Sequence, residues 1–398
     1  MSSGITPRRF KAFVGGCLRL SGYLRRPGDG RVRPQIPAAG LLWSLLLGFV
    51  LREVSFQAIE ALVRSRARRA LGVGRRFSDD TLAYFTERLS ADAARRALAS
   101  VLRRSKRNKA LAGSFWIGLA VDGTTAGRSR QAKCAVCHPL FNARHEVVGH
   151  QHRLSLISVV GTGLSLPFDV EPYGPGDSEY AASQRLLGRA VGLLGRRFAD
   201  YVVVDGEYAT APFVHRAGDL GLWVVARLKA NLPELYEAAQ RRFESRPPDE
   251  TILDGTERVE LWDADDFDPW EALRWPTVRV LRYRQHQAGG KVVEAYWLTD
   301  FPRHLLSRQQ LSRLAKSRWE VENQGFNDAK NRYGMAHIPH HHPNSLLLHW
   351  LLMVFAMTVE RLYRLRYLHR GRHRPYTAIE LVRRLRLSLA PPAAADSS

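Results

Sequence analysis

Residues 115–123 have the sequence FWIGLAVDG, an apolar run that ends in aspartate and glycine. Residues 201–206, YVVVDG, have the same form. Short apolar runs of this kind predict strands that are buried on both faces. A carboxylate where such a strand ends lies at the sheet edge where α/β proteins place their ligand sites. The two runs therefore predict an α/β fold in which Asp122 and Asp205 meet at one edge of the sheet.

Residues 318–330, RWEVENQGFNDAK, gather charged and amide side chains in a predicted half-buried helix. Helical neighbours recur at three and four residues, so Arg318, Glu322 and Lys330 fall along one face. Glu320 points nearly the opposite way, because two residues rotate the helix by about 200°. We therefore assign Glu322 to a site shared with Arg318, and we expect Glu320 to face solvent or to pair with a neighbouring cation. The alternative for this segment alone is a solvated amphipathic helix.

Asp122, Asp205 and Glu322 would repel one another if the two strands and the helix brought them together. Divalent cations neutralise such a cluster, and hard oxygen ligands suit Mg²⁺ or Mn²⁺. The sequence lacks a Walker-type Gly-rich loop and a Gly-x-Ser-x-Gly elbow, so nothing supports nucleotide hydrolysis or a serine nucleophile. We expect metal-assisted phosphoryl transfer with two ions about 3.5 to 4 Å apart.

These motifs resemble those of bacterial insertion-sequence transposases, which have a DDE catalytic triad and a ribonuclease-H-like core. The first aspartate of the triad matches Asp122 in VDGT, the second matches Asp205 in VVDGEYA, and the glutamate matches Glu322. The resemblance extends over residues 36–368. It implies a mixed sheet flanked by helices, an N-terminal helical domain and a β-rich insertion before the catalytic helix.

The subgroup with a tyrosine, arginine, glutamate and lysine signature is the most similar. Its arginine matches Arg318, which lies the correct four residues before Glu322. The sequence departs from the signature at two positions. Ala315 stands where the tyrosine is expected, and the lysine is Lys330, one residue later than the pattern.

The resemblance also implies cut-and-paste DNA transposition through a hairpin intermediate. The expected partner is double-stranded DNA, from the element ends and the target, on which a homodimer assembles. Asp122, Asp205 and Glu322 would hold two Mg²⁺ or Mn²⁺ ions. Two alternatives stay open: a catalytically inactive, transposase-derived DNA-binding protein, and a stand-alone nuclease that cleaves DNA without joining a 3′-hydroxyl end to a target.

The 398 residues carry a formal net charge of +22, which favours a polyanionic partner such as DNA, RNA or an acidic membrane face. Several basic side chains at the ends of predicted elements are candidates for contacts with DNA phosphates. They are Arg103, Arg104, Lys106, Arg107, Lys229, Arg318 and Lys330. For Lys229 the alternative is ordinary surface charge, and for the basic helix end before residue 110 it is a plain helical cap.

Three cysteines are too few for a disulfide framework and fit a reducing cytosol. No signal peptide is apparent at the N-terminus. The apolar run at residues 38–51 is too short to span a bilayer and predicts a buried helix. We therefore expect a cytoplasmic, nucleoid-associated bacterial protein with no membrane partner.

Cys134 and Cys137 have half the spacing of a zinc site, and the histidines at 337 and 340–342 could supply the other half. We favour free, buried cysteines, because two cysteines three apart in a strand point to opposite sides. The histidines are then loop residues near DNA phosphate. The further acids Asp169, Glu171 and Glu207 are expected to be solvated or to cap helices.

Residues 115–123, 131–140 and 147–160 predict the strands of an antiparallel meander, and Gly289-Gly290 predicts a hairpin turn. The predicted divisions of the chain are a basic flexible arm (1–34), a helical DNA-binding region (35–112), the first part of the core (113–229), a β-rich insertion (230–302), the catalytic and bracing helices (303–370), and a basic C-terminal helix and tail (371–398). A disordered tail is the alternative for the first segment.

Overall fold

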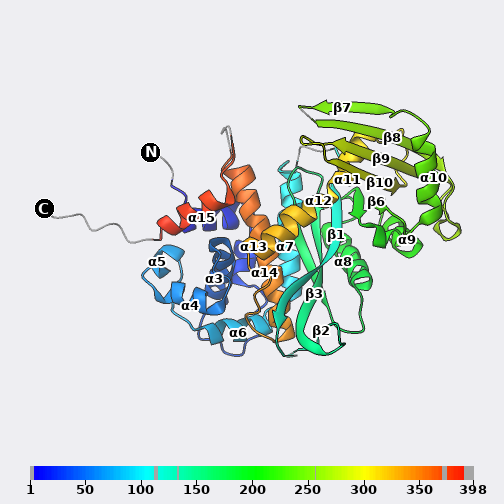
Figure 1. Ribbon diagram of the computed structural model, residues 1–398. Coiled ribbons are helices and arrows are strands. Elements are labelled where there is room, and N and C mark those ends of the chain that lie inside the picture. Colours follow the sequence, from blue (N-terminus) through cyan, green and yellow to red (C-terminus); the bar gives the residue numbers. More distant parts are fainter. Residues whose placement is uncertain (1–3, 112–114, 132–133, 256, 370–373, 390–398) are drawn as a thin grey trace.

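A ten-stranded mixed sheet crosses the molecule, with helices on its faces and a helical part at one end (Figure 1). This computed structural model describes residues 4–111, 115–131, 134–255, 257–369 and 374–389. The strand order is β2-β3-β1-β5-β6-β10-β9-β8-β7, and β4 also pairs with β3. The predicted α/β class, a mixed sheet flanked by helices, is confirmed.

The core half of the sheet places β1 between β3 and β5. Its strands are β1 (Gly118–Ser129), β2 (Cys137–Phe141), β3 (Val147–Val160), β4 (Leu166–Tyr173), β5 (Tyr201–Val204) and β6 (Trp223–Leu228). β1 pairs antiparallel with β3 and parallel with β5, and β5 pairs parallel with β6. All four residues of β5 are buried, as expected for a strand covered on both faces.

The predicted meander is wrong in its strand order. β3, rather than β2, is the antiparallel neighbour of β1. β2 and β4 share the other edge of β3, whose 14 residues are long enough to pair with both. The length of a strand, and not its place in the sequence, therefore decides the pairing here.

The predicted β-rich insertion continues the core sheet. It contains α10 (Pro233–Glu244), β7 (Glu250–Asp254), β8 (Glu257–Phe267), the 3₁₀ turn η3 (Glu271–Leu273), β9 (Val278–His286) and β10 (Val292–Thr299). β10 pairs antiparallel with β6, which joins the two halves of the sheet. Gly289 and Gly290 form the predicted turn between β9 and β10, with φ angles of 94° and 82° that glycine adopts without strain.

Helices cover both faces of the core sheet. On one face, Ser183 of α8 (Glu179–Leu194) donates a hydrogen bond to the hydroxyl of Ser155 on β3, at 2.9 Å. On the other, Gly325 lies beside Leu156 and Ser158 of the same strand. Successive strand residues point to opposite faces, so these contacts place the two helices on opposite sides of β3.

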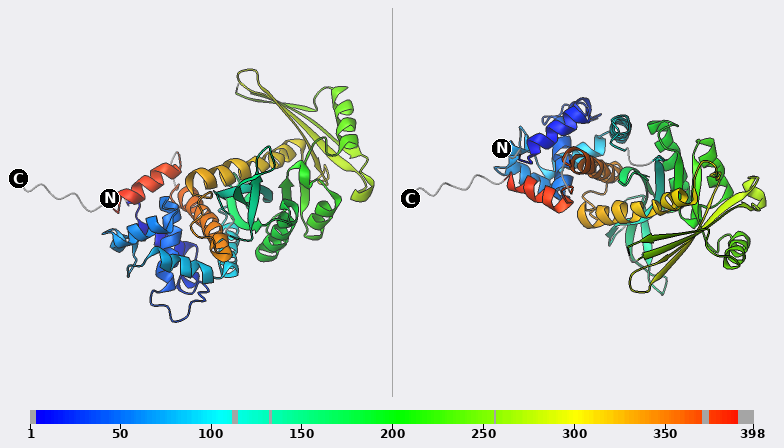
Figure 2. Two further views of the ribbon diagram at one scale, coloured as in Figure 1. Left: turned by 60° about the horizontal axis from the view of Figure 1, so that its bottom comes forward. Right: turned by 90° about the horizontal axis from the view of Figure 1, so that it is seen from above.

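Gly325 belongs to the 318–332 helix, the name used here for α12 (Arg318–Glu320), the π-helical η4 (Val321–Phe326) and α13 (Asn327–Arg332). The 318–332 helix continues α11 (Arg308–Lys316), and together they form the long helix that crosses the sheet in Figure 2. The connection between β5 and β6 contains the 3₁₀ turn η2 (Gly206–Tyr208) and α9 (Ala211–Asp219).

The N-terminal segment is folded, so the prediction of a flexible arm is wrong for residues 4–34. It forms α1 (Pro7–Ala12), the π-helical η1 (Phe13–Cys17) and α2 (Ser21–Arg25). Phe10, Val14 and Leu20 are each 1% exposed. The Phe10 ring lies 6.0 Å from that of Trp43 and 5.1 Å from that of Tyr363. Apolar residues spaced among the arginines therefore anchor this segment to the core.

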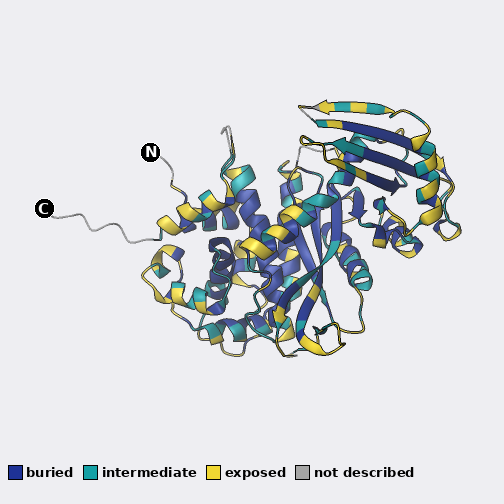
Figure 3. Cartoon of the chain, viewed as in Figure 1, coloured by how far each residue is buried: buried dark blue, intermediate teal, exposed yellow. Residues whose placement is uncertain are grey.

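The helical part of the molecule packs around one long buried helix. Its members are α3 (Ala38–Leu51), α4 (Phe56–Arg64), α5 (Arg68–Leu71), α6 (Asp79–Arg88), α7 (Ala91–Arg107), α14 (Pro343–Leu362), the π-helical η5 (Tyr363–Tyr367) and α15 (Ala378–Leu387). α14 and η5 are long and apolar enough to cross a membrane, but 94% of their most apolar window is buried inside the protein. α14 contacts β4, α3, α6 and α7. Figure 3 shows the buried interior of this part in dark blue. α3 is the predicted buried helix.

Candidate active site

Asp122 and Asp205 are brought together by the register of β1 and β5. Ala120 and Val203 are the last paired residues of this parallel pair, and each aspartate lies two residues further along. β1 does not end at Asp122, as the sequence predicted, but continues to Ser129 against β3. It is the pairing with β5 that ends here. The two carboxylates therefore lie where β1 and β5 separate.

Asp122 is largely buried, with 19% of its side chain exposed. Burial raises its pKa to about 6, and the carboxylates of Glu179 and Glu322 act in the same direction. The Arg318 guanidinium and the N–H of Gly123, which donates to Asp122 Oδ1 at 2.9 Å, oppose this rise. A carboxylate in these surroundings is stabilised by added positive charge, such as that of a divalent cation.

Asp205 directly follows β5 and is held by Lys229 at the end of β6. Lys229 Nζ donates to Asp205 Oδ2 at 2.7 Å. Burial favours the protonated acid, but the bond from Lys229, the adjacent Gly206 N–H and the charge of Arg318 outweigh it and lower the pKa of Asp205. Asp205 Oδ1 is buried and has no hydrogen-bond partner among the described residues. Lys229 thus contacts Asp205, which keeps one oxygen available to a ligand.

Arg318 links the third acid to the first. Its Nη1 lies 2.8 Å from Glu322 Oε1 and 3.6 Å from Asp122 Oδ2. The side chain of Arg318 is only 12% exposed. Its charge also acts on Asp205. Arg318 therefore contacts Asp122 and Glu322 and acts on Asp205 through its charge, which offsets the mutual repulsion of the three acids.

Glu322 lies in a π-helical stretch that the sequence did not predict. η4 runs from Val321 to Phe326, between the α-helical turns α12 and α13. Val321 is fully buried, and Gly325 lies beside β3 without a side chain that would hold the helix away. Such π turns are frequent at functional sites, because they shift side chains out of the ordinary helical spacing.

Glu320 points away from Asp122, as predicted, but it does not face solvent. Its carboxylate accepts a hydrogen bond from the N–H of Gly161, at 3.3 Å, in the turn between β3 and β4. Burial raises the pKa of Glu320 to about 6. Gln324, one turn later, accepts from the N–H of Ser165 at the other end of that turn. The side of the helix opposite the acids is therefore attached to the sheet.

Glu179 is a fourth acid at the site, and the sequence analysis assigned it no role there. The carboxylate of Glu179 occupies the space that a β-carbon on Gly123 would need. Tyr208 donates to Glu179 Oε1 at 2.8 Å, and the charge of Glu179 acts on Asp122. Because Glu179 is the first residue of α8, its place in the sequence indicates only an acid that caps a helix. Gly123, directly after Asp122, was the available sequence signal, because a glycine within a strand indicates that another group approaches the backbone closely.

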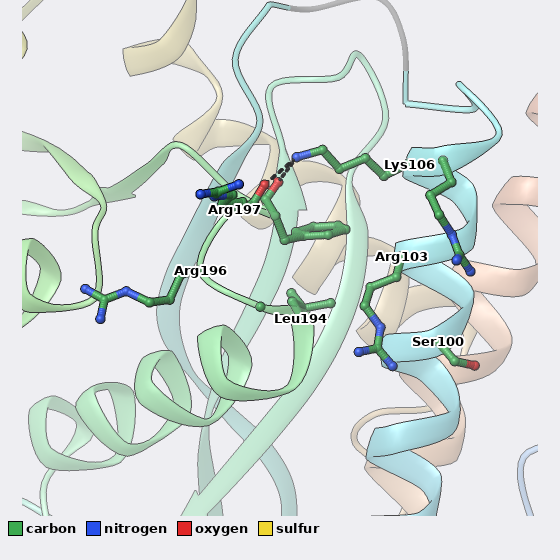
Figure 4. Close-up of a pocket in the computed structure, with 9 residues that line it drawn as sticks. Ser100, Arg103, Lys106, Leu194, Arg196 and Arg197 are labelled. Atoms are coloured by element: carbon green, nitrogen blue, oxygen red, sulfur yellow. Dashed lines mark hydrogen bonds between the residues drawn. The ribbon is translucent and has the colours of Figure 1, made fainter.

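The basic residues at the end of α7 border a cavity of about 840 Å³ (Figure 4). Arg103 and Arg107 line it from α7, and Arg196 and Arg197 line it from the loop after α8. Lys106 is engaged within the protein, because its Nζ donates to the carbonyls of Arg197 and Phe198 at 2.8 and 2.6 Å. Arg104 does not line the cavity, and the charges of Arg19 and Arg107 act on it.

Lys330 is exposed at the far end of the 318–332 helix, with Nζ 6.0 Å from the centre of the Phe326 ring. Burial of part of the side chain lowers its pKa. The structure thus places Arg318 among the acids and Lys330 on the surface, two turns beyond Glu322. Phosphate contacts by either residue stay predictions.

The remaining acids play structural parts. Asp169 was expected to be solvated or to cap a helix, but it is fully buried between two arginines. Arg95 Nε and Arg189 Nε lie 2.9 and 2.7 Å from its two oxygens. Glu171 pairs with Arg189 at 2.8 Å. Glu207 is exposed in η2, as expected.

The arrangement of donors fits hard divalent cations. Asp122, Asp205 and Glu322 offer carboxylate oxygens, the ligands that Mg²⁺ and Mn²⁺ prefer. The partnerless oxygen of Asp205 and the raised pKa of Asp122 both indicate a site that additional positive charge would stabilise. These residues could therefore hold such ions.

Comparisons with known proteins agree with this geometry. Residues 117–359 match the family described as Transposase DDE domain. No curated protein matches the sequence significantly. Among solved structures, the piggyBac transposase synaptic complex with hairpin DNA is similar, with a TM-score of 0.50 and 12% sequence identity. The likeness covers 97% of this chain and 80% of that one, and it shows a shared fold. The family match spans more than half of the chain, which therefore belongs to the DDE-domain transposases.

Proposed function

We propose that this transposase cleaves and joins DNA at the ends of a bacterial insertion sequence, using two divalent metal ions held by Asp122, Asp205 and Glu322. The observation that carries the proposal is that Arg318 contacts Asp122 and Glu322 and acts by its charge on Asp205, one oxygen of which has no hydrogen-bond partner among the described residues. The spacing of Arg318 and Glu322 supports the subgroup with the tyrosine, arginine, glutamate and lysine signature.

The three acids have one shared task, which is to hold the ions. When bound, Mg²⁺ or Mn²⁺ activates the attacking oxygen and stabilises the leaving oxygen of the phosphodiester. Lys229 fixes the orientation of Asp205 by donating a hydrogen bond to Oδ2 of that carboxylate. The Gly123 N–H likewise fixes Asp122 by donating to Oδ1 of the Asp122 carboxylate. Arg318 has a planar guanidinium suited to bidentate phosphate contact, so it would grip the phosphate beside the scissile bond.

The DNA itself would follow the basic surface. Arg103, Arg107, Arg196 and Arg197 surround a cavity in which the described residues place no carboxylate. Lys330 would add a contact near the acids. The net charge of +22 draws DNA to this surface. The similar piggyBac structure is a synaptic complex with hairpin DNA, which supports a cut-and-paste route through a hairpin intermediate. We further propose a homodimer on the paired ends, within the bacterial nucleoid.

Strand cleavage and joining by the purified full chain test this function. The substrate is DNA that carries the natural flanks of the gene, with and without Mg²⁺. We expect metal-dependent release of a 3′-hydroxyl end and its transfer to a target plasmid. Asp122→Ala and Asp205→Ala should abolish both steps while DNA binding remains. Glu207→Gln, which changes an exposed acid two residues from Asp205, is the matched control and should retain activity.

Three outcomes would contradict the proposal. Cleavage without any joining to the target would indicate a stand-alone nuclease. Binding with no cleavage by the wild-type chain, under any divalent cation, would indicate a DNA-binding protein that has lost the reaction. Cleavage that survives the loss of Asp122 or Asp205 would place the chemistry elsewhere.

A further inference from the structure

A second cluster of metal-ligating side chains lies at the opposite end of β3 from the turn that holds Glu320. It consists of Cys134, Cys137, His152 and His341, whose ligand atoms all lie within 4.8 Å of one another. Cys134 precedes β2, Cys137 begins it, His152 is on β3, and His341 comes from the segment before α14. Three separate parts of the chain therefore meet at this point.

The separations within the cluster fit a tetrahedral ion. Cys134 Sγ lies 3.3 Å from Cys137 Sγ and 3.1 Å from His152 Nε2, and Cys137 Sγ lies 3.5 Å from His152 Nε2. In a tetrahedral zinc site, two sulfurs are about 3.8 Å apart, and a sulfur and a nitrogen are about 3.5 Å apart. Two sulfurs joined in a disulfide would be about 2.05 Å apart. The cysteines are free thiols placed as ligands.

The local backbone explains how both sulfurs reach one point. We had expected both cysteines to lie in one strand, where they would diverge. Instead Cys134 lies in a tight turn, in which the N–H of Cys137 donates to the carbonyl of Cys134 at 3.2 Å. Cys137 is then the direct partner of His152 across the β2–β3 pair, so their side chains share one side of the sheet. The two sulfurs therefore do not diverge as they would in one continuous strand, which was the reason for expecting no zinc site.

The core encloses half of the cluster, and Cys134 and His341 are half-buried at its edge. His152 is fully buried and Cys137 nearly so. The Trp350 ring of α14 lies 5.9 Å from that of His152, and the His341 ring lies 6.1 Å from it. Two thiolates and two imidazoles fill all four positions of a tetrahedral ion, as in a structural zinc site, whereas a catalytic site keeps one position open to water.

We propose that Cys134, Cys137, His152 and His341 bind one structural Zn²⁺ ion, with release of the two thiol protons to solvent. The ion fastens the segment 333–342 to the β2–β3 edge. This segment directly follows the 318–332 helix and leads into α14. Gly127 of β1 already contacts it closely, at Ala336 and Ile338. The zinc site thus positions the C-terminal end of the helix that carries Glu322, and it is separate in ligand chemistry from the oxygen site at Asp122.

Metal analysis of the full chain, purified without chelators, tests the proposal. We expect one zinc per chain, retained in Asp122→Ala, which separates this ion from those at the acids. Cys137→Ser and His341→Asn should lose it. Two matched controls should keep it: Cys17→Ser removes the exposed thiol, and His342→Asn removes the exposed histidine next to His341.

Two further measurements on the wild-type chain do not depend on the folding of any variant. Replacing zinc by Co²⁺ should give thiolate-to-cobalt charge-transfer absorption and the visible bands of a tetrahedral ion. Thiol titration of the native chain should detect Cys17 at once, and Cys134 and Cys137 only after a chelator is added. A folded wild-type chain that neither contains zinc nor binds Co²⁺ with a thiolate signature overturns the proposal, as does equal thiol reactivity with and without chelator.

Discussion

Arg318 and Glu322 form an ion pair across one turn of the helix, with Nη1 2.8 Å from Oε1. The same Nη1 lies 3.6 Å from Asp122, so this pair connects the helix to the sheet at the candidate site. Glu320 lies only two residues before Glu322 but bonds to Gly161 on the other side of the helix. Two glutamates of one segment therefore have different surroundings, and they should respond differently to the same substitution.

Glu322→Gln should abolish metal-dependent strand cleavage, because an amide is a poor ligand for Mg²⁺ and removes the negative charge that pairs with Arg318. DNA binding should persist, since the loss of a negative charge does not weaken attraction to phosphate. Cleavage of labelled element-end DNA and a binding titration measure the two effects. Glu320→Gln is the control, as it keeps an acceptor for the Gly161 N–H and should retain cleavage. Reversed results would exchange the roles of the two acids.

Gly123→Ala should destabilise the chain and impair cleavage, because the new β-carbon would overlap the Glu179 carboxylate. The cost should be smaller in a Glu179→Ala background, where the overlapping group is absent. Thermal unfolding of the two single variants and the double variant gives this coupling. Additive effects would show that the close approach of Glu179 is not the cause.

Asp300→Asn should stabilise the fold at neutral pH. Burial raises the pKa of Asp300 to about 6 from an ordinary value of 3.8, although the Val224 N–H donates to it at 2.7 Å. The folded state therefore binds the proton more tightly than the unfolded state, and stability falls as pH rises from about 4 to 6. An uncharged amide avoids this cost, which is on the order of 3 kcal/mol above pH 6. Unfolding temperatures should favour the variant at pH 7.5 and converge near pH 3.5; an equal gain at both would contradict this cause.

DNA affinity should fall steeply with salt, with a slope of log affinity against log salt of about 0.9 for each phosphate contacted. Arg103→Ala with Arg107→Ala should reduce this slope, because both exposed side chains line the basic cavity. Arg185→Ala is the control, since Asp177 and Glu171 already pair with that guanidinium. Fluorescence anisotropy at several salt concentrations measures the slopes. A slope unchanged by the double substitution would remove the cavity from the DNA path.

Much of the core could be predicted from the sequence. The runs before Asp122 and Asp205 carry their own strand signal, and Gly289 and Gly290 form the hairpin turn that their residue type predicts. These features depend on neighbouring residues alone. The spacing of Arg318 and Glu322 likewise predicted their contact, as residues four apart on a helix face one another.

The features that the sequence did not predict depend on contacts between distant parts of the chain. Glu179 lies beside Gly123 because α8 packs on β1 and β3, and the periodicity of the sequence does not reveal that packing. Phe10 and Val14 are dispersed among arginines, so their burial is visible only once α3 and η5 are placed around them. The turn before Cys137 breaks the strand alternation on which the argument against a metal site relied.

The π turn at Val321–Phe326 bears on the position of Lys330 in the sequence. A π turn uses about one residue more than an α turn for the same circuit of the axis. Relative to Glu322, a lysine after such a turn must lie one residue later in the sequence to keep the same angular position around the helix axis. Lys330 is displaced from the signature by one residue in that direction. A wider turn at this place would let Lys330 take the angular position around the helix that the signature gives its lysine.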